Sequence, residues 1–549
     1  MNRSDNRAPG MTATNTSSFK LATWQGMTLA LLLGMGCFLL TMGNPMNVIA
    51  GGLMIDTDYP NAAAAFEIFV RDAWRWPIGA SPHFGGVNIF FSDGAPWFAF
   101  LSKAVLSLTG VFLAFHWLIV IDVLLFALMA RRLATKVSED EAVRWLITVL
   151  LLFTLIMLVR MIGAQHIALG SYWVVLWAMC CVPVLNEAPR GLRRWEFLPA
   201  AGIAILSHAY LGAMAITIVC VALLFERRWW ATLAALLFPA LLLYCVGVFD
   251  GNHSTTEGAK DYSLDLGAYA ETLGWGLLPN LYQIPEPTQG DAILYLGTGT
   301  WALALMGLVS VIVLKFKGAD LGWSTWNTPA NFRQDAHQRR LQILVMAALV
   351  LAFYALTFKI RLVGFTLLKT DIPSIFMPFY ERFRVTGRFG APLAFMLIIG
   401  FVLLWGRLKP WMPKVLWFGV AALAILLQVL DVRVAGLKSP PQDWLAEAAD
   451  QRSAVASVLE DREWSGRVFK TVGYFDLEQQ RLIDRLLVDY GARHFEVVHG
   501  ARLDPDEVIR RSGFDQAEPG DAVVLDQDDA SPACQAQAAV KNFKLCLVE

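Results

Sequence analysis

The sequence predicts an α-helical polytopic membrane protein with about eleven transmembrane helices, interfacial helices in the first outer loop and a small C-terminal α/β domain. Composition predicts the membrane class: 56% of the 549 residues are hydrophobic and only 17% are charged, whereas a soluble protein of this length needs a more polar surface. Apolar runs of membrane length recur along the chain up to residue 431, and the remainder is polar. The chain therefore divides into a membrane part and a polar C-terminal part.

Eleven apolar runs approach the roughly 20 residues that a helix needs to cross the hydrocarbon layer. The predicted spans are residues 24–43, 111–130, 143–160, 167–185, 196–207, 209–225, 229–249, 293–314, 341–358, 390–406 and 414–431. The fifth is short for a full crossing. The motif Ser207-His208-Ala209-Tyr210 at its end therefore predicts a broken helix or a re-entrant turn that lines a cavity.

Basic residues predict the orientation, because cytoplasmic loops of membrane proteins carry an excess of Lys and Arg. They fall on alternate loops, on the same side as the basic N-terminus, which is therefore predicted to lie in the cytoplasm. An odd number of spans then places the C-terminal domain outside. The residues that mark the cytoplasmic side are Arg3, Arg7, Lys20, Arg131, Arg132, Lys136, Arg144, Arg190, Arg193, Arg194, Arg227, Arg228, Lys315, Lys317, Arg333, Arg339, Arg340, Arg407, Lys409 and Lys414. The net charge of −1 gives no global attraction to nucleic acid, so we expect no nucleic-acid partner.

The polar C-terminal part predicts a separate α/β domain over residues 435–549, after a membrane domain of residues 1–434 and a linker at Ser439-Pro440-Pro441. Residues 467–474, 494–499, 522–526 and 543–548 have strand patterns, and residues 443–460, 477–489 and 505–511 have helical ones. We see no catalytic motif and expect a lid or docking module. Cys534 and Cys546 would plausibly form a disulfide outside the cytoplasm.

The first outer loop, between the first two spans, carries carboxylates and many aromatic residues. Asp56 and Asp58 follow the first span by about a dozen residues. Phe66, Phe69, Val70 and Ala73 then recur at helical spacing, while Glu67, Arg71 and Arg75 mark another face, which predicts a helix lying flat in the interface. Such a helix would hold Asp58 at the depth of the lipid headgroups.

Residues 359–388 break the orientation rule, because a loop predicted to be outside holds six cations. The densest part contains Arg382, Arg384 and Arg388. Arginine binds phosphate with two parallel hydrogen bonds, so this cluster predicts a site for a lipid phosphate or pyrophosphate. The alternative is that these arginines pair with headgroups or with loop carboxylates.

Other polar residues have both a functional and a structural reading. Asp122 lies within a predicted span, where an ionisable group is a functional hypothesis or a structural partner of Arg160. His166 and His208 lie at predicted outer ends of helices and could line a pocket or cap a helix. The loop of residues 250–292 could hold a divalent metal or simply be solvated; its acidic and histidine residues are Asp250, His253, Glu257, Asp261, Asp265 and Glu271.

Several motifs together resemble a family of uncharacterised bacterial multi-span proteins related to GT-C glycosyltransferases. They begin with Asp56-Thr57-Asp58, residues 72–79 (DAWRWPIG) and residues 91–96 (FSDGAP). They continue with residues 163–166 (GAQH), 207–211 (SHAYL), 295–297 (YLG) and 383–389 (FRVTGRF). The resemblance covers residues 24 to about 431 and is moderately specific as a set, although each motif alone is weak.

The resemblance implies an inverting membrane glycosyltransferase that moves a sugar from a polyprenyl-phosphate donor to a glycan or lipid acceptor of the cell envelope. The protein would lie in the bacterial inner membrane and act on the periplasmic side. By analogy Asp58, and next Asp56, would be the catalytic base, with Arg382, Arg384 and Arg388 binding the lipid phosphate and Asp93, His166, His208 and Tyr210 as possible pocket residues. Relatives carry a histidine soon after this aspartate where this chain has Ala62 to Ala65, so the resemblance leaves metal use open.

Two other classes stay open on the sequence alone. A lipid or polysaccharide transporter would also place charges in outer cavities, but it should show internal repeats, and we find no convincing one. A non-catalytic partner of an envelope assembly is the third class. It predicts that Asp58→Asn leaves cellular glycans unchanged while deletion of residues 435–549 abolishes function.

Overall fold

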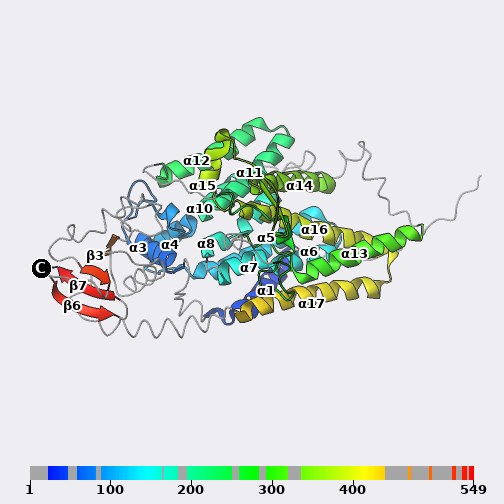
Figure 1. Cartoon of the computed structure of the whole chain (residues 1–549), viewed down its shortest axis with the longest axis horizontal. Coiled ribbons are helices and arrows are strands. Elements are labelled where there is room, and N and C mark those ends of the chain that lie inside the picture. Colours follow the sequence, from blue (N-terminus) through cyan, green and yellow to red (C-terminus); the bar gives the residue numbers. More distant parts are fainter. Residues whose placement is uncertain are drawn as a thin grey trace, which may run out of the picture.

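The fold was analysed in a computed structural model. It describes residues 23–46, 59–81, 88–163, 166–182, 195–249, 259–282, 292–318 and 336–438, and the strand residues 468–471, 494–496, 522–526, 534–540 and 543–548. Helices dominate the part up to residue 438 (Figure 1). They are α1 (Thr23–Met42), α3 (Tyr59–Arg71), α4 (Pro96–Thr109), α5 (Trp117–Val137), α6 (Glu141–Leu152), α7 (Leu155–Ile162), α8 (Ile167–Gly170), α9 (Trp173–Cys180), α10 (Phe197–Ser207), α11 (Ala209–Phe225), α12 (Trp229–Val246), α13 (Thr298–Phe316), α14 (Ala336–Ala355), α15 (Met377–Arg382), α16 (Ala391–Leu408) and α17 (Lys414–Lys438).

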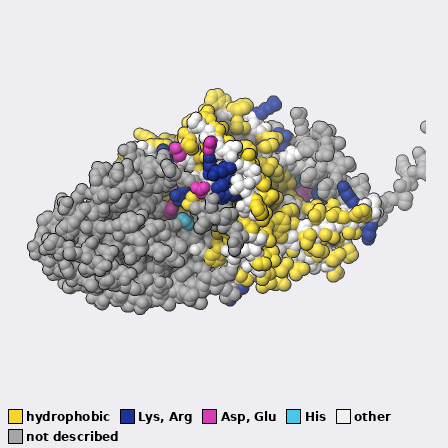
Figure 2. Space-filling model, in the orientation of Figure 1, with side chains coloured by type: hydrophobic (Ala, Val, Ile, Leu, Met, Phe, Trp, Pro, Cys, Tyr) yellow, Lys and Arg dark blue, Asp and Glu magenta, His cyan; other side chains and the backbone are white. Residues whose placement is uncertain are grey.

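The membrane class predicted from composition is confirmed. Among the described residues, seven helical segments are long and apolar enough to cross a membrane, by length and composition: Trp24–Met42, Glu141–Met161, Trp229–Val246, Thr298–Phe316, His337–Ala355, Thr386–Trp411 and Lys414–Gly436. Three shorter apolar segments are Ile167–Cys180, Phe197–Ser207 and Ala209–Phe225. Each of the eleven predicted spans overlaps helical residues, while the number of actual crossings stays a prediction. Figure 2 shows hydrophobic side chains over the part of the bundle where α13 and α17 lie in Figure 1, as a lipid-facing surface requires.

The break predicted at Ser207-His208 is present. α10 ends at Ser207, His208 has an extended backbone, and α11 begins at Ala209. The two helices then pack closely against each other. A Cβ atom on Gly212 of α11 would lie 2.5 Å from the Cα of Ile205 of α10, so only glycine allows this approach. The turn places His208 outside both helices, at the tip of the hairpin.

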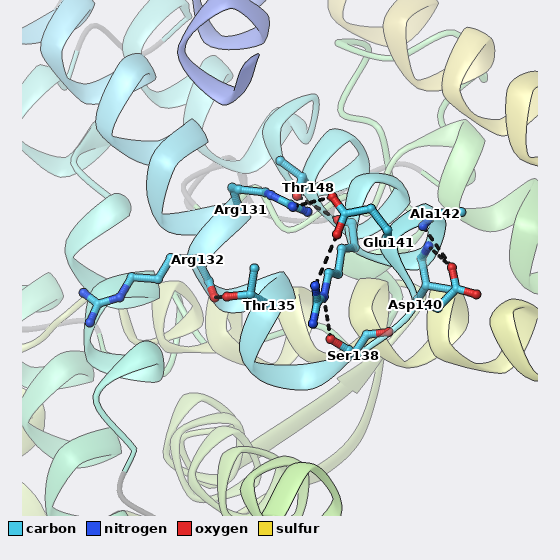
Figure 3. A network of polar contacts seen from close by, with 10 residues as sticks. Arg131, Arg132, Thr135, Ser138, Asp140, Glu141, Ala142 and Thr148 are labelled. Carbon is cyan, nitrogen blue, oxygen red and sulfur yellow. Dashed lines mark hydrogen bonds and ion pairs between the residues drawn. The ribbon is translucent and has the colours of Figure 1, made fainter. Parts of the chain in front are cut away.

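The basic residues predicted to share one side of the membrane gather at one end of the bundle. Glu141, at the start of α6, accepts hydrogen bonds from Arg131 (2.5 Å) and Arg144 (3.2 Å), and Asp140 caps α6 (Figure 3). Arg132 forms a bidentate pair with Glu196 at the start of α10. Further pairs at this end are Arg339–Glu226 and Lys409–Asp140. This clustering agrees with the predicted loop order, and its assignment to the cytoplasm stays a prediction.

A buried polar network positions the segment Tyr295-Leu296-Gly297, one of the motifs behind the family resemblance. Asp431 of α17 accepts hydrogen bonds from the backbone N–H and the hydroxyl of Thr298, at the start of α13. The side-chain amide of Gln428 donates to the carbonyl of Leu296. Gly297 has φ +98°, and a Cβ there would lie 2.0 Å from the Gln428 amide nitrogen. This motif therefore has a structural explanation.

The first outer loop contains the predicted helix. All side chains described in α3 are buried except those of Glu67 and Arg71, so protein covers most of α3, and its place in the membrane interface stays a prediction. Its Phe66 stacks on Phe98 of α4, with ring centroids 5.6 Å apart. The small side chains of Ala62 to Ala65 permit this close packing on several sides. Ala73, predicted to be on its apolar face, lies beyond the end of the helix.

Strands form two sheets. An antiparallel hairpin, β1 (Lys359–Leu362) and β2 (Phe365–Lys369), follows α14. Beyond residue 438, β3 (Val468–Thr471), β4 (His494–Glu496), β5 (Ala522–Asp526), β6 (Cys534–Val540) and β7 (Phe543–Val548) form a sheet of order β4-β3-β5-β7-β6. In Figure 1 this sheet lies toward the same end of the molecule as α3 and α4.

The C-terminal sheet agrees with four predicted strands and adds β6. Sequence patterns missed β6 because alanine and glutamine, its main residues, are weak strand formers. β3 pairs in parallel with β4 and β5, as an α/β unit requires. The predicted helices 443–460, 477–489 and 505–511 lie outside the described residues, and α17 runs four residues past the predicted boundary at 434.

The strand register does not support the predicted disulfide. Cys534 of β6 lies opposite Val548, two positions along β7 from Cys546, and the register shifts between Cys534 and Ala536. Two residues of extended strand span about 7 Å and neighbouring strands lie about 4.8 Å apart, whereas disulfide-bonded Cα atoms lie within about 7 Å. The disulfide stays a prediction, because two cysteines in one polar domain do not fix their relative register.

Candidate functional site at the outer end of the bundle

The two carboxylates favoured as catalytic base, Asp56 and Asp58, lie outside the described residues. The chain next to them is described. Tyr59 is buried and its ring lies 5.9 Å from that of Phe115. α3 therefore begins at a packed aromatic contact.

A carboxylate–histidine pair joins the first outer loop to the α10–α11 turn. The Nε2 atom of His208 lies 3.3 Å from Oδ1 of Asp93. The Nδ1 atom of His208 accepts a hydrogen bond from the backbone N–H of Tyr210 and so caps α11. A neutral imidazole that accepts at Nδ1 carries its proton on Nε2. His208 therefore donates to Asp93.

Asp93 lies in a turn with an unusual backbone conformation. Asp93 and Ala95 both have positive φ angles, 53° and 46°, in the turn that leads into α4. Such angles cost non-glycine residues free energy and persist only where the surroundings impose them. The side chain of Asp93 is 47% exposed, whereas that of His208 is 10% exposed. One carboxylate thus reaches solvent while its histidine partner stays inside.

The surroundings of His208 disfavour its charged form. Burial lowers the pKa of His208 below its usual value, and the positive charges of Arg388 and His166 lower this pKa further. The hydrogen bond and charge of Asp93 act in the opposite direction and raise it. Because the net shift is downward, the imidazole is neutral at pH 7.

Tyr210 connects this pair to the arginine-rich segment. Its hydroxyl accepts a hydrogen bond of 2.8 Å from the backbone N–H of Val385. Its ring contacts those of Phe383 and Phe389, with centroids 5.3 and 5.6 Å away. The guanidinium carbon of Arg388, in the short helix η10 (Thr386–Gly390), lies 5.0 Å from the centroid of the same ring. A cation over a tyrosine face is a stabilising arrangement.

We refer to Asp93, His208, Tyr210 and Arg388 as the outer-end cluster, after the end of the bundle that the sequence predicts to face outward. His166 is close enough to act electrostatically on His208, so the structure brings together all four predicted pocket residues with Arg388. The other two predicted phosphate ligands differ from Arg388, which is 6% exposed. Arg382 and Arg384 are exposed, and Arg384 lies 4.9 Å over the ring of Tyr262.

Sequence reasoning missed Tyr172, a neighbour of the cluster. Tyr172 is hydrogen-bonded to the buried side chain of Arg160 and lies within electrostatic range of Arg388. One of the two interpretations of the sequence paired Arg160 with Asp122. Asp122 instead accepts hydrogen bonds from Ser171 (2.9 Å) and Trp173 (2.8 Å). Asp122 therefore has structural partners other than the predicted Arg160.

No group of three or more His, Cys, Asp or Glu residues that could hold a metal occurs among the described residues. Asp265 accepts hydrogen bonds from the backbone N–H groups of Gly267, Val363 and Gly364. Glu271 similarly binds those of Leu273, Leu281 and Tyr282. These two carboxylates hold loops together. Asp250, His253 and Glu257 lie outside the described residues.

Comparison with known proteins gives a family. A family model described as a domain of unknown function (DUF6311) matches residues 31–433. The chain belongs to the DUF6311 family. The matched range contains the whole outer-end cluster and stops before the C-terminal sheet, so the cluster is part of the DUF6311 domain itself.

The chain is similar to two solved structures of ArnT from Cupriavidus metallidurans, one bound to undecaprenyl phosphate and one in the apo state. The identities are 13% and 12%, and each match covers 95% of this chain and 97% of the other, with a TM-score of 0.45. No curated protein matches the DUF6311 chain by sequence.

Proposed function

We propose that this DUF6311 protein is a membrane glycosyltransferase that moves a sugar from a polyprenyl-phosphate donor to a glycan or lipid acceptor of the cell envelope, on the outer side of the bacterial inner membrane. The observation that carries the proposal is Arg388. Its buried guanidinium lies over Tyr210, beside the Asp93–His208 pair, at the end of the bundle opposite the inner basic network.

The chemistry of Arg388 favours a phosphate-bearing ligand. A buried guanidinium cannot lose its proton, so a site that holds one gains most from an anion. Arg384, four residues earlier, is exposed and can meet a phosphate at the entrance. A neutral His208 adds no positive charge of its own, so Arg388 is the main cation of the cluster. The guanidinium fork matches the geometry of a phosphate with two parallel hydrogen bonds.

The reaction proposed is a single displacement. Asp58, or Asp56, accepts the proton of the acceptor hydroxyl as that oxygen attacks the anomeric carbon. The bond from this carbon to the lipid phosphate oxygen breaks, and the released phosphate retains the electron pair. Arg384 and Arg388 stabilise the charge on the departing phosphate. One displacement inverts the anomeric centre. The half-exposed Asp93 carboxylate, held by His208, contacts the sugar or the acceptor.

Surface glycans test the proposal directly. Lipopolysaccharide and related polymers are compared by mass spectrometry in cells that carry wild type, Asp58→Asn or Arg388→Ala at matched protein levels. We expect both variants to lose the same sugar. Lys315→Ala is the matched control, because Lys315 is an exposed cation at the C-terminal end of α13, opposite the end where the outer-end cluster lies. Unchanged glycans in both variants would favour a transporter or a non-catalytic assembly partner.

A further inference from the structure

The segment between α14 and η10 exposes an unusual concentration of large apolar side chains. It comprises the β1–β2 hairpin, the short helix η9 (Ser374–Phe376) and α15. Phe365 is 74% exposed and Ile375 is 75% exposed. The other exposed apolar residues are Leu362, Val363, Leu367, Leu368, Phe376, Met377 and Phe379. All five residues of β2 are exposed. We call these residues the apolar ridge.

The ridge is held in place by the body of the protein. Asp265 binds the backbone N–H groups of Val363 and Gly364 at the hairpin turn. The rings of Tyr380 and Tyr354 stack with centroids 4.7 Å apart. The Tyr354 hydroxyl donates to the carbonyl of Phe379. These contacts fix the backbone on both sides of the ridge. The fold therefore holds the apolar side chains in their exposed positions.

Water is an unfavourable environment for such a surface. Full exposure of one large apolar side chain costs about 1.5–3 kcal/mol relative to burial, so nine half-exposed ones cost on the order of 10 kcal/mol. Contiguous apolar patches of this kind normally mark a contact with a membrane or another protein.

Two features beside the apolar ridge indicate that it contacts the lipid bilayer. First, the ridge follows directly on α14, a membrane-length helix whose own exposed residues include Leu349, Val350 and Phe353. Second, the exposed cations Lys369, Arg382 and Arg384 border the ridge. An apolar surface edged by Lys and Arg is typical of segments that lie in the headgroup region with their apolar side in the acyl chains.

The backbone limits the depth of insertion. A two-stranded hairpin leaves unpaired N–H and C=O groups on its outer edges, and these are too costly to place in the hydrocarbon centre. Asp371, in the same segment, is fully exposed and pairs with Lys260 at 2.8 Å. Its pKa is lowered by that hydrogen bond and by the charge of Lys260, so Asp371 is charged at pH 7 and belongs in water.

We infer that the apolar ridge is inserted in the outer leaflet, with Lys369, Arg382 and Arg384 at the depth of the lipid phosphates and Asp371 in water. The ridge is linked to the outer-end cluster through Tyr354, whose ring lies 4.9 Å from that of Phe389. The bilayer surface would thus lie beside the cluster. This inference concerns membrane contact and does not depend on the transferase chemistry.

Photolabelling of the full-length wild-type protein tests the inference. The protein is reconstituted in bilayers of phosphatidylethanolamine and phosphatidylglycerol that contain a phospholipid with a diazirine on its acyl chain. A parallel sample receives a water-soluble diazirine. Trypsin cleavage after Arg361, Lys369 and Arg382 releases the ridge as two peptides, 362–369 and 370–382, for mass spectrometry. We expect acyl-chain labelling of both peptides, severalfold above labelling by the water-soluble reagent.

The double variant Phe365→Ser/Ile375→Ser should lower acyl-chain labelling of these peptides severalfold and leave labelling of α14 unchanged. Asp371→Asn is the matched control and should label as wild type does. Two results would overturn the inference: stronger labelling of both peptides by the water-soluble reagent, or protection from both reagents, which would mean that protein covers the ridge. Because the readout is membrane contact, it is separate from any loss of surface glycan.

Discussion

The Nε2 atom of His208 donates a hydrogen bond to the carboxylate of Asp93 across 3.3 Å, and the Nδ1 atom of the same ring caps α11. Residues that are far apart in the sequence are thus joined by one imidazole with a fixed tautomer. The pair lies against Tyr210 and Arg388, and the carboxylate of Asp93 is half-exposed.

Asp93→Asn should lower the pKa of His208 further, because it removes the charge that opposes the effect of burial. Titration of isotopically labelled histidine by NMR measures this pKa, and His208→Gln assigns the signal. Arg75→Gln changes an exposed cation of the same loop and should leave the titration unaltered. An unchanged or higher pKa in Asp93→Asn would show that the Asp93–His208 contact does not form in solution.

Tyr210→Phe should destabilise the protein by about 1–3 kcal/mol, because the buried N–H of Val385 loses its acceptor. Thermal unfolding in detergent, followed by intrinsic fluorescence, measures the change. Tyr380→Phe is the matched comparison, since the Tyr380 hydroxyl makes a longer contact of 3.4 Å, and its effect should be smaller. Equal melting temperatures for Tyr210→Phe and wild type would contradict the role assigned to the hydroxyl.

Gly297→Ala should destabilise the protein by more than about 2 kcal/mol, because the new methyl group overlaps the Gln428 amide and the φ angle of +98° is unfavourable for alanine. Gly307→Ala in the same helix, α13, has its nearest neighbour at 3.5 Å and should be tolerated. The comparison uses yield and melting temperature in detergent. Similar behaviour of the two variants would argue against a structural role for the Tyr295-Leu296-Gly297 motif.

Lys103 gives a pH-dependent prediction. Its ammonium group donates to the carbonyl of Ala73 and lies 4.0 Å from the Phe69 ring centroid. Burial lowers its pKa to about 8, an effect that Asp72 opposes and Arg75 reinforces. The folded protein therefore binds this proton less tightly than the unfolded chain does, and stability should rise as pH increases from about 8 to about 10.5.

Comparison with Lys103→Met isolates this effect. Between pH 8 and 10.5, the stability of wild type relative to the variant should rise by up to about 3 kcal/mol. Below pH 8 the difference should be constant. The measurement is thermal or denaturant unfolding across this pH range. A difference that does not vary with pH would mean that Lys103 keeps its ordinary pKa.

The sequence predicted the membrane architecture well, because apolar runs of membrane length have few alternatives. It also singled out residues that the structure brings together in the outer-end cluster, since His208 and Arg388 are polar groups next to apolar spans and such groups are costly without a purpose. The roles of these residues stay predictions. The partners of buried charges were less predictable. Asp122 binds Ser171 and Trp173 and not Arg160, because helix packing, and not sequence spacing, decides which side chains meet.

The surroundings of the first outer loop and of the C-terminal strands were also hard to predict. Periodicity identified α3, but an apolar face fits a lipid interface and a protein interior equally well, and the structure buries it. The register of β6 against β7 depends on how the strands pair, which composition does not encode. Asp56 and Asp58 lie outside the described residues, so their role rests on the family resemblance.

The central claim is that Arg388 binds the phosphate of a polyprenyl-linked donor, and ligand binding tests it most directly. Native mass spectrometry of the purified full-length protein with undecaprenyl phosphate compares wild type, Arg388→Gln, Arg388→Lys and the control Lys315→Gln. Loss of a charged hydrogen bond costs about 1.5–3 kcal/mol, so Arg388→Gln should bind roughly 10- to 100-fold more weakly. Arg388→Lys should be intermediate, and Lys315→Gln should bind as wild type does. Wild-type affinity in Arg388→Gln would contradict the proposed phosphate site.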